Sequence, residues 1–174
     1  RALMRAVQAR GWHGVVSHFR GCGGAVNTLP RAYHAGDSAE VAWLLARLAS
    51  EGRPVCAVGV SLGGNMLLKH LGEAGASAPL CAAAAVSAPL DLAAAGRMLE
   101  RGLARQLYTR MFLFFLKPAS LATARRHPGL IDVRRAQASR TLREFDDAVT
   151  APLHGFAGVE DYWARASAKP WLRQ

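Results

Sequence analysis

Apolar positions along the first ninety residues recur in an order that predicts alternating strands and helices. Continuous apolar runs predict strands at residues 14–19, 55–58 and 80–86, of the kind that a parallel sheet buries on both faces. Helices are predicted near residues 1–10, after Asp37, and through Met66 to Leu71, where apolar side chains recur three and four apart. Asp37 and Glu40 have the spacing of a capping box at a helix start. Connections of this length predict parallel pairing, so the fold class is α/β, a parallel sheet with crossover helices.

The alternation stops after Pro89, and the later sequence reads as helices and loops. We therefore expect residues 1–90 to form the central part of a core with three parallel strands, and residues 91–174 to form a mainly helical cap. The first residues lie inside an amphipathic pattern with no capping residue before it. The last residues follow Pro170 without a closing element, so we expect the chain to be a fragment of a longer protein.

Composition narrows the class of protein. Of the 174 residues, 51% are hydrophobic and 20% are charged, which excludes a disordered chain. The longest apolar runs fall short of the roughly 18 residues that cross a bilayer. Three widely spaced cysteines match neither a disulfide framework nor a zinc site, so we expect a cytoplasmic location, no metal and no cofactor.

The net charge of +10 is concentrated in one segment. Residues 97–143 hold eleven basic side chains and two acidic ones. Arg97, Arg101 and Arg105 recur four apart beside a stripe of leucines, the pattern of a basic amphipathic helix that could lie on an anionic membrane. The alternative is a cap helix that packs its leucines on the domain and leaves its arginines in water. No recognition helix, RNA-binding motif or zinc pattern is present, so no nucleic-acid partner is expected.

The candidate chemistry lies in Gly59-Val60-Ser61-Leu62-Gly63, a GxSxG pattern between a predicted strand and a predicted helix. In a nucleophile elbow the serine occupies a strained turn, and Gly59 and Gly63 would remove side chains that clash. The backbone N–H of Leu62, at the helix N-terminus, would then face a developing oxyanion. The alternative is a glycine-rich turn without chemistry.

A serine nucleophile needs a base and an orienting acid. His127 and His154 follow Ser61 in the chain, and neither follows a predicted strand. The candidate acids after Ser61 are Asp91, Asp132, Asp146 and Asp147. Asp91 stands where a strand-end acid could enter a site, or where an aspartate caps the next helix. The residues alone therefore leave the base and the acid open.

Several segments together resemble the YheT-like α/β-hydrolases. They are RALMRAVQARGWHGVVSHFRGCGG, YHAGD, AVGVSLGGNMLLKHLGE, SAPLDL and REFDDAVTAPLHGF, which span nearly the whole chain. The resemblance implies a serine hydrolase that acts on carboxylic esters, with Ser61 as the nucleophile, the Leu62 N–H in the oxyanion hole, and a helical cap. His18, Arg20, Asp146, Asp147 and His154 match family segments without a role that we can assign.

The resemblance also implies that the oxyanion loop precedes this chain and that the acid and histidine of the triad follow it. We therefore expect the chain alone to be inactive, and the full-length protein to hydrolyse a small-molecule or lipid ester. The alternative is a module without catalysis that binds an anionic membrane or an acidic partner through Arg97, Arg101 and Arg105.

Overall fold

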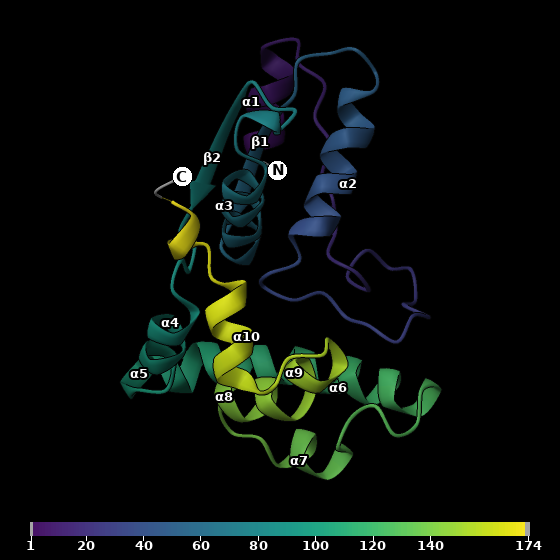
Figure 1. Ribbon diagram of the computed structural model, residues 1–174, viewed down its shortest axis with the longest axis vertical. Coiled ribbons are helices and arrows are strands. Elements are labelled where there is room, and N and C mark those ends of the chain that lie inside the picture. Colours follow the sequence, from purple (N-terminus) through teal and green to yellow (C-terminus); the bar gives the residue numbers. More distant parts are fainter. Residues whose placement is uncertain (1, 173–174) are drawn as a thin grey trace.

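The computed structural model describes residues 2–172 and divides into a region that contains the sheet and a layer of helices beneath it (Figure 1). The first region comprises α1 (Ala2–Ala9), α2 (Ser38–Ala49), β1 (Cys56–Val60), α3 (Leu62–Ala74), the 3-10 turn η1 (Gly75–Ser77) and β2 (Ala82–Val86). After Asp91 the elements are helical: α4 (Leu92–Leu99), α5 (Gly102–Ala104), the π-helical turn η2 (Arg105–Thr109), α6 (Arg110–Arg126), α7 (Val133–Ala138), α8 (Leu142–Phe145), the π-helical turn η3 (Asp146–Thr150), α9 (Ala151–Leu153), α10 (Val159–Ala166) and the 3-10 turn η4 (Lys169–Trp171).

The sheet confirms the α/β class and two of the predicted strands. β1 and β2 pair in parallel, in a register that runs from Cys56 opposite Ala82 to Val60 opposite Val86. α3 connects them and packs on both strands, as parallel pairing requires of the crossover segment. Val58, Val60 and Val86 remain exposed in the described chain.

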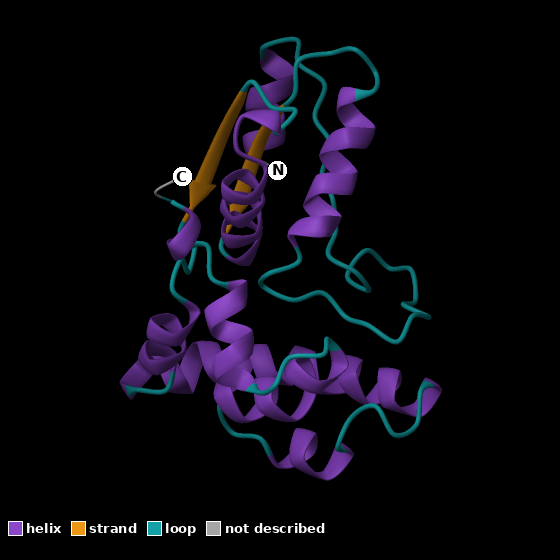
Figure 2. Cartoon of the chain, in the orientation of Figure 1, coloured by secondary structure: helices purple, strands orange, loops and turns teal. Residues whose placement is uncertain are grey.

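The predicted strand at residues 14–19 was wrong. These residues run as a loop (Figure 2), and the described residues contain two strands rather than the three expected. The pattern is apolar enough for a strand, but a strand exists only where a neighbour accepts and donates its backbone hydrogen bonds. Among residues 2–172 the ladder joins β1 and β2 alone, and Val15 and Val16 stay exposed.

The predicted helix after Asp37 forms, but the capping box does not. Asp37 makes no side-chain cap hydrogen bond to α2. Both of its carboxylate oxygens instead accept from Arg31 Nη2, at 3.0 and 2.7 Å, and Glu40 accepts from Arg20 Nε at 2.7 Å. Charge-assisted bonds to guanidinium groups are stronger than a bond to a backbone N–H, so the two carboxylates are drawn to the arginines of the preceding loop.

The buried apolar side chains form two clusters. The first, which we call the junction cluster, lies where the sheet region meets α4 and α10, and consists of Ala35, Leu92, Ala151, Val159, Tyr162, Trp163 and Ala166. The second, the cap cluster, lies inside the helical layer and consists of Leu113, Ala124, Ile131, Ala136, Phe145, Ala148 and Val149. No helix within residues 2–172 combines the length and the apolar character that crossing a bilayer demands.

Candidate active site

Ser61 occupies the sharp turn between β1 and α3. Its backbone has φ +52° and ψ −121°, a left-handed conformation that costs a residue other than glycine strain energy. Three hydrogen bonds hold this conformation: Ser61 N donates to Val86 O at 2.8 Å, and Ser61 O accepts from Gly64 N and Asn65 N at 2.9 and 3.3 Å. Ser61 is exposed, so the strained turn presents its hydroxyl to solvent above the end of the sheet.

Two glycines allow the chain to close this turn. A Cβ on Gly59 would lie 2.5 Å from Gly63 O and 2.7 Å from Gly64 Cα, and a Cβ on Gly64 would lie 2.8 Å from Ala88 Cβ. A Cβ on Gly63 would meet only the Phe19 ring, at an ordinary 3.6 Å. The close packing of the turn therefore requires glycine at positions 59 and 64. The GxSxG pattern predicts instead that Gly59 and Gly63 are the required glycines.

The start of α3 supplies the backbone donors of the site. Within the described chain the N–H groups of Leu62 and Gly63 have no acceptor, as expected in the first turn of a helix. The Leu62 side chain packs against the junction cluster. A helix N-terminus with free N–H groups favours negative charge, so this turn can stabilise an oxyanion formed beside Ser61.

Asn65 anchors the helix that carries the site, and the motif search did not single it out. It is fully buried. Its Nδ2 donates to Ala35 O and Ala166 O, both at 2.8 Å, and its Oδ1 accepts from Ala168 N at 2.9 Å. A polar residue among Met66, Leu67 and Leu68 is the signal that could have revealed it, because a buried amide must find partners.

An aromatic pair lies beside the elbow. The rings of Phe19 and Tyr33 stack with centroids 4.9 Å apart, and Phe19 approaches Gly63. Burial, and to a lesser extent the neighbouring Cys22 thiol, raise the pKa of the Tyr33 hydroxyl, so Tyr33 stays neutral near pH 7. The loop at residues 14–37, predicted in part as a strand, thus supplies an apolar wall to the site.

The two candidate histidines, His127 and His154, contact groups other than Ser61. The His127 ring bonds Thr28 O through Nε2 at 2.9 Å. The His154 ring lies 4.4 Å from that of His34, centroid to centroid, and burial lowers its pKa to about 4. Among residues 2–172 no side chain forms a hydrogen bond with the Ser61 hydroxyl, so the described chain contains no base in position for it.

The candidate acids hold the helical layer together. Asp91 and Asp132 cap α4 and α7, with the N–H of Ala94 at 2.9 Å and that of Arg135 at 3.0 Å. Asp91 thus follows the capping alternative, and Lys169 Nζ also donates to it at 2.9 Å.

The two neighbouring aspartates of the late segment have different surroundings. Asp147 pairs with Arg135 at 2.6 Å and accepts from Val159 N at 3.2 Å. Asp146 accepts from the Thr150 hydroxyl at 2.7 Å and from Trp163 Nε1 at 2.9 Å. Burial raises the pKa of Asp146 to about 6, although both hydrogen bonds oppose the shift. These contacts assign both residues a structural role in the described chain. No group of three metal-ligating side chains occurs within it.

Comparison with known proteins finds similarity over nearly the whole chain. The chain is 43% identical over 176 residues to "Putative esterase YheT" of Escherichia coli (strain K12), covering 99% of this chain and 52% of that protein. It is 31% identical over 169 residues to "Phospholipase ABHD3" of Mus musculus, covering 94% and 40%. It is 29% identical over 178 residues to "Medium-chain fatty acid ethyl ester synthase/esterase 2" of Saccharomyces cerevisiae (strain ATCC 204508 / S288c), covering 88% and 40%.

No family model matches the chain, and no solved structure matches it. The chain spans about half the length of YheT and about two fifths of the other two relatives. The similarity to YheT includes the elbow and the helical segments after it, as the sequence resemblance implied. The chain belongs to the YheT-like α/β-hydrolases.

Proposed function

We propose that the protein is a serine hydrolase of carboxylic esters with Ser61 as its nucleophile. The single observation that carries this proposal is the strained backbone of Ser61, at φ +52° between β1 and α3. Strain of this kind persists only where the surrounding structure enforces it, and it concentrates at functional sites. The three relatives described above all carry the word esterase or phospholipase in their names, which supports ester hydrolysis.

The chemistry follows from the geometry of the turn. Ser61 Oγ attacks the ester carbonyl carbon, the Oγ–C bond forms, and the carbonyl oxygen becomes an oxyanion that the Leu62 N–H stabilises. The Ser61 proton passes to a base and then to the alcohol oxygen as the ester C–O bond breaks, which leaves an acyl-enzyme. Water, deprotonated by the same base, attacks the acyl carbon. The Oγ–C bond then breaks, the acid is released, and the base returns the proton to Ser61 Oγ.

We propose that the base is a histidine oriented by a carboxylate. Both would lie in the part of the full-length protein that corresponds to the region of the relatives that this chain does not span. The chain covers about half of YheT, and Ser61 has no base within the described residues. The proposal therefore concerns the full-length protein, and the chain alone is expected to be inactive. Sequencing the encoding DNA beyond codon 174 tests this: a strand ending in Asp followed by a strand and a His supports it, and a stop codon contradicts it.

The substrate is proposed to be an ester with an apolar acyl chain. Phe19 and Tyr33 provide an apolar wall beside the elbow, where such a chain could lie. Two of the relatives are named a phospholipase and a medium-chain fatty acid ethyl ester synthase/esterase. We further propose a cytoplasmic location, because Cys22, Cys56 and Cys81 are all free and exposed, as in proteins of reducing compartments.

Labelling the intact, full-length protein with a fluorophosphonate tests the proposal. We expect labelling of the wild type and none of Ser61→Ala. Ser87→Ala is the matched control, because Ser87 is also exposed and has φ +50° at the end of the adjacent strand, but no helix begins directly after it. Equal labelling of Ser61→Ala and wild type would refute the assignment. Absence of any labelling would favour the alternative of a binding module without catalysis.

A further inference from the structure

A stripe of large apolar side chains lies exposed along α5, η2 and α6. α5 and α6 belong to the layer of helices in the lower half of Figure 1. Its strongest members are Leu103, Leu107, Phe114 and Phe115, with 74%, 64%, 73% and 67% of their surface exposed. Met98, Tyr108 and Met111 extend it. Leu103 and Leu107 are therefore not packed on the domain, as a simple cap helix would require, whereas Leu113 and Ala124 of α6 are buried in the cap cluster.

The π-helical turn keeps this stripe on one side of the helix. A repeat of four residues drifts around an α-helix by about 40° per step, because one turn takes 3.6 residues. η2 bonds over five residues, so it takes up extra residues per turn and offsets part of that drift. Leu103, Leu107, Met111 and Phe115 thus stay near one line, which spans roughly 18 Å at 1.5 Å per residue.

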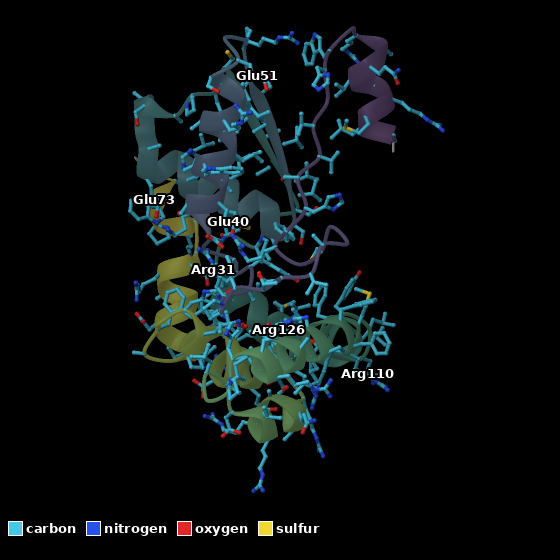
Figure 3. The ribbon with its side chains drawn as sticks, turned by 90° about the vertical axis from the view of Figure 1, so that its right-hand side faces the viewer. Arg31, Glu40, Glu51, Glu73, Arg110 and Arg126 are labelled. Carbon is cyan, nitrogen blue, oxygen red and sulfur yellow. The ribbon has the colours of Figure 1, made fainter. Side chains whose placement is uncertain are left out.

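The borders of the stripe are cationic. Arg97, Arg101, Arg105 and Arg110 are exposed, and the sequence contains no acidic residue between Glu100 and Asp132. Figure 3 shows Arg110 on the side of the helical layer opposite α10.

A cavity of about 720 Å³ lies along the same helices. Its basic lining residues are Arg105, Arg110, Lys117 and Arg140, and Phe114 and Leu113 also face it. Glu100 is the acidic residue of the lining, and it lies 3.7 Å from Arg143. The surface therefore combines exposed apolar side chains with an excess of positive charge beside them.

We infer that this surface docks on the headgroup layer of an anionic phospholipid bilayer. Large contiguous apolar patches on a protein surface mark sites of interaction. The partner must carry negative charge to match the arginines and an apolar layer to receive Phe114 and Phe115. A second copy of this surface would oppose arginine to arginine, which like-charge repulsion disfavours. An anionic bilayer offers phosphate groups to the guanidinium groups and hydrocarbon just beneath them.

The inference does not depend on the proposed catalysis, since none of these residues forms a hydrogen bond with Ser61 in the described chain. The test is sedimentation of the full-length protein with vesicles of phosphatidylcholine, with and without phosphatidylglycerol. Binding is expected only to the anionic vesicles, to weaken with salt, and to be the same for Ser61→Ala. Each arginine near the surface contributes roughly fivefold in affinity, so Arg101→Glu, Arg105→Glu and Arg110→Glu together should weaken binding about 100-fold or more. The matched control changes three exposed arginines elsewhere: Arg5→Glu, Arg53→Glu and Arg134→Glu.

A second readout tests whether the apolar stripe enters the bilayer. In Phe115→Trp, we expect the emission of the new tryptophan to shift to the blue when anionic vesicles are added, in a background where the exposed Trp12 and Trp43 are replaced by phenylalanine. Leu107→Ser with Phe114→Ser should abolish the shift. Three outcomes would overturn the inference: equal weakening by the control arginines, an emission already blue without vesicles because other protein covers the stripe, or self-association that Phe114→Ser removes.

Discussion

The junction cluster and the cap cluster differ in how far apart their residues lie in the sequence. All members of the cap cluster fall between Leu113 and Val149, on consecutive helices and, for Ile131, on the loop between α6 and α7. The junction cluster joins the loop at Ala35, the start of α4 and the segment from Ala151 to Ala166. One cluster forms within a single helical segment, whereas the other forms only when segments more than one hundred residues apart come together.

This difference changes how backbone polar groups are satisfied. In the cap cluster, helices satisfy most of their own N–H and C=O groups. At the junction, loops and helix ends are buried, and side chains must satisfy them: the Tyr162 hydroxyl accepts from Ala35 N at 2.9 Å, and Ser167 Oγ accepts from Leu92 N at 3.0 Å. Asn65 binds three more such groups. Contacts between distant segments therefore depend on a few polar side chains, and a local helical core does not.

The largest effect is expected from Asn65→Leu. This change leaves Ala35 O, Ala166 O and Ala168 N buried without partners, which should lower the free energy of unfolding by roughly 3 to 5 kcal/mol. Urea denaturation measures it. The matched control is Asn27→Leu, since Asn27 binds backbone groups within a partly exposed loop, and the expected loss is about 1 kcal/mol. Equal losses would mean that the junction does not depend on Asn65.

The next effect comes from the glycines of the elbow. Gly59→Ala and Gly64→Ala place a Cβ within 3.0 Å of other atoms, so each should cost about 1 to 3 kcal/mol and displace Ser61. Gly63→Ala meets only the Phe19 ring at 3.6 Å and should cost much less. Denaturation together with fluorophosphonate labelling of the full-length protein checks both effects. A Gly63→Ala variant as damaged as the other two would contradict the contacts described here.

These glycines show how far the sequence predicts the site. The GxSxG pattern between a strand and a helix predicts the sharp turn at Ser61 that the structure contains, because the turn is local and its residue types are restricted. The same pattern does not identify Gly64, whose close neighbour is Ala88, two residues after the end of β2. Periodicity likewise predicts two strands correctly and a third wrongly, since residues 14–19 have the right side chains but no ladder partner among the described residues.

The sequence also does not predict which polar groups contact one another at the junction. The choice for Asp91 between a catalytic acid and a helix cap depends on what approaches its carboxylate, and Lys169 and Ala94 do so in the folded chain. His154 and Asp146 stand in matching family segments, but only the fold shows that His34 and Trp163 are their neighbours. Long-range contacts decide these roles, and the sequence alone does not record them.

Asp146 links the two clusters, and its ionisation should couple their stability to pH. Its folded pKa of about 6 lies above the ordinary 3.8, so the folded protein holds this proton more tightly than the unfolded chain does. Its contribution to stability is therefore complete below pH 3.8 and is lost as the pH rises through 6. Asp146→Asn removes this loss. The free energy of unfolding of Asp146→Asn minus that of the wild type should therefore be about 1 to 3 kcal/mol larger at pH 7 than at pH 4.

His154 should act in the opposite direction. Its folded pKa of about 4 lies below the ordinary 6.5, because burial disfavours its charge, and His34 and Arg31 add to the effect against the opposing Asp37. Its contribution is complete above pH 6.5 and is lost as the pH falls toward 4. Urea titrations between pH 4 and 7 should thus show stability rising with pH in Asp146→Asn and falling with pH in His154→Phe. Parallel slopes in the two variants would contradict this assignment.

The smallest effect on folding is expected from the exposed stripe of the helical layer. Leu107→Ser and Phe114→Ser change side chains that are mostly in water, so each should alter the free energy of unfolding by no more than about 0.5 kcal/mol. Leu113 lies next to Phe114 in the sequence but is buried in the cap cluster, and Leu113→Ala should cost about 2 to 5 kcal/mol. A loss of more than about 1 kcal/mol for Phe114→Ser would show that the stripe is covered in the folded protein. The helix would then use both of its apolar faces for packing, and the stripe would not be free to meet a membrane.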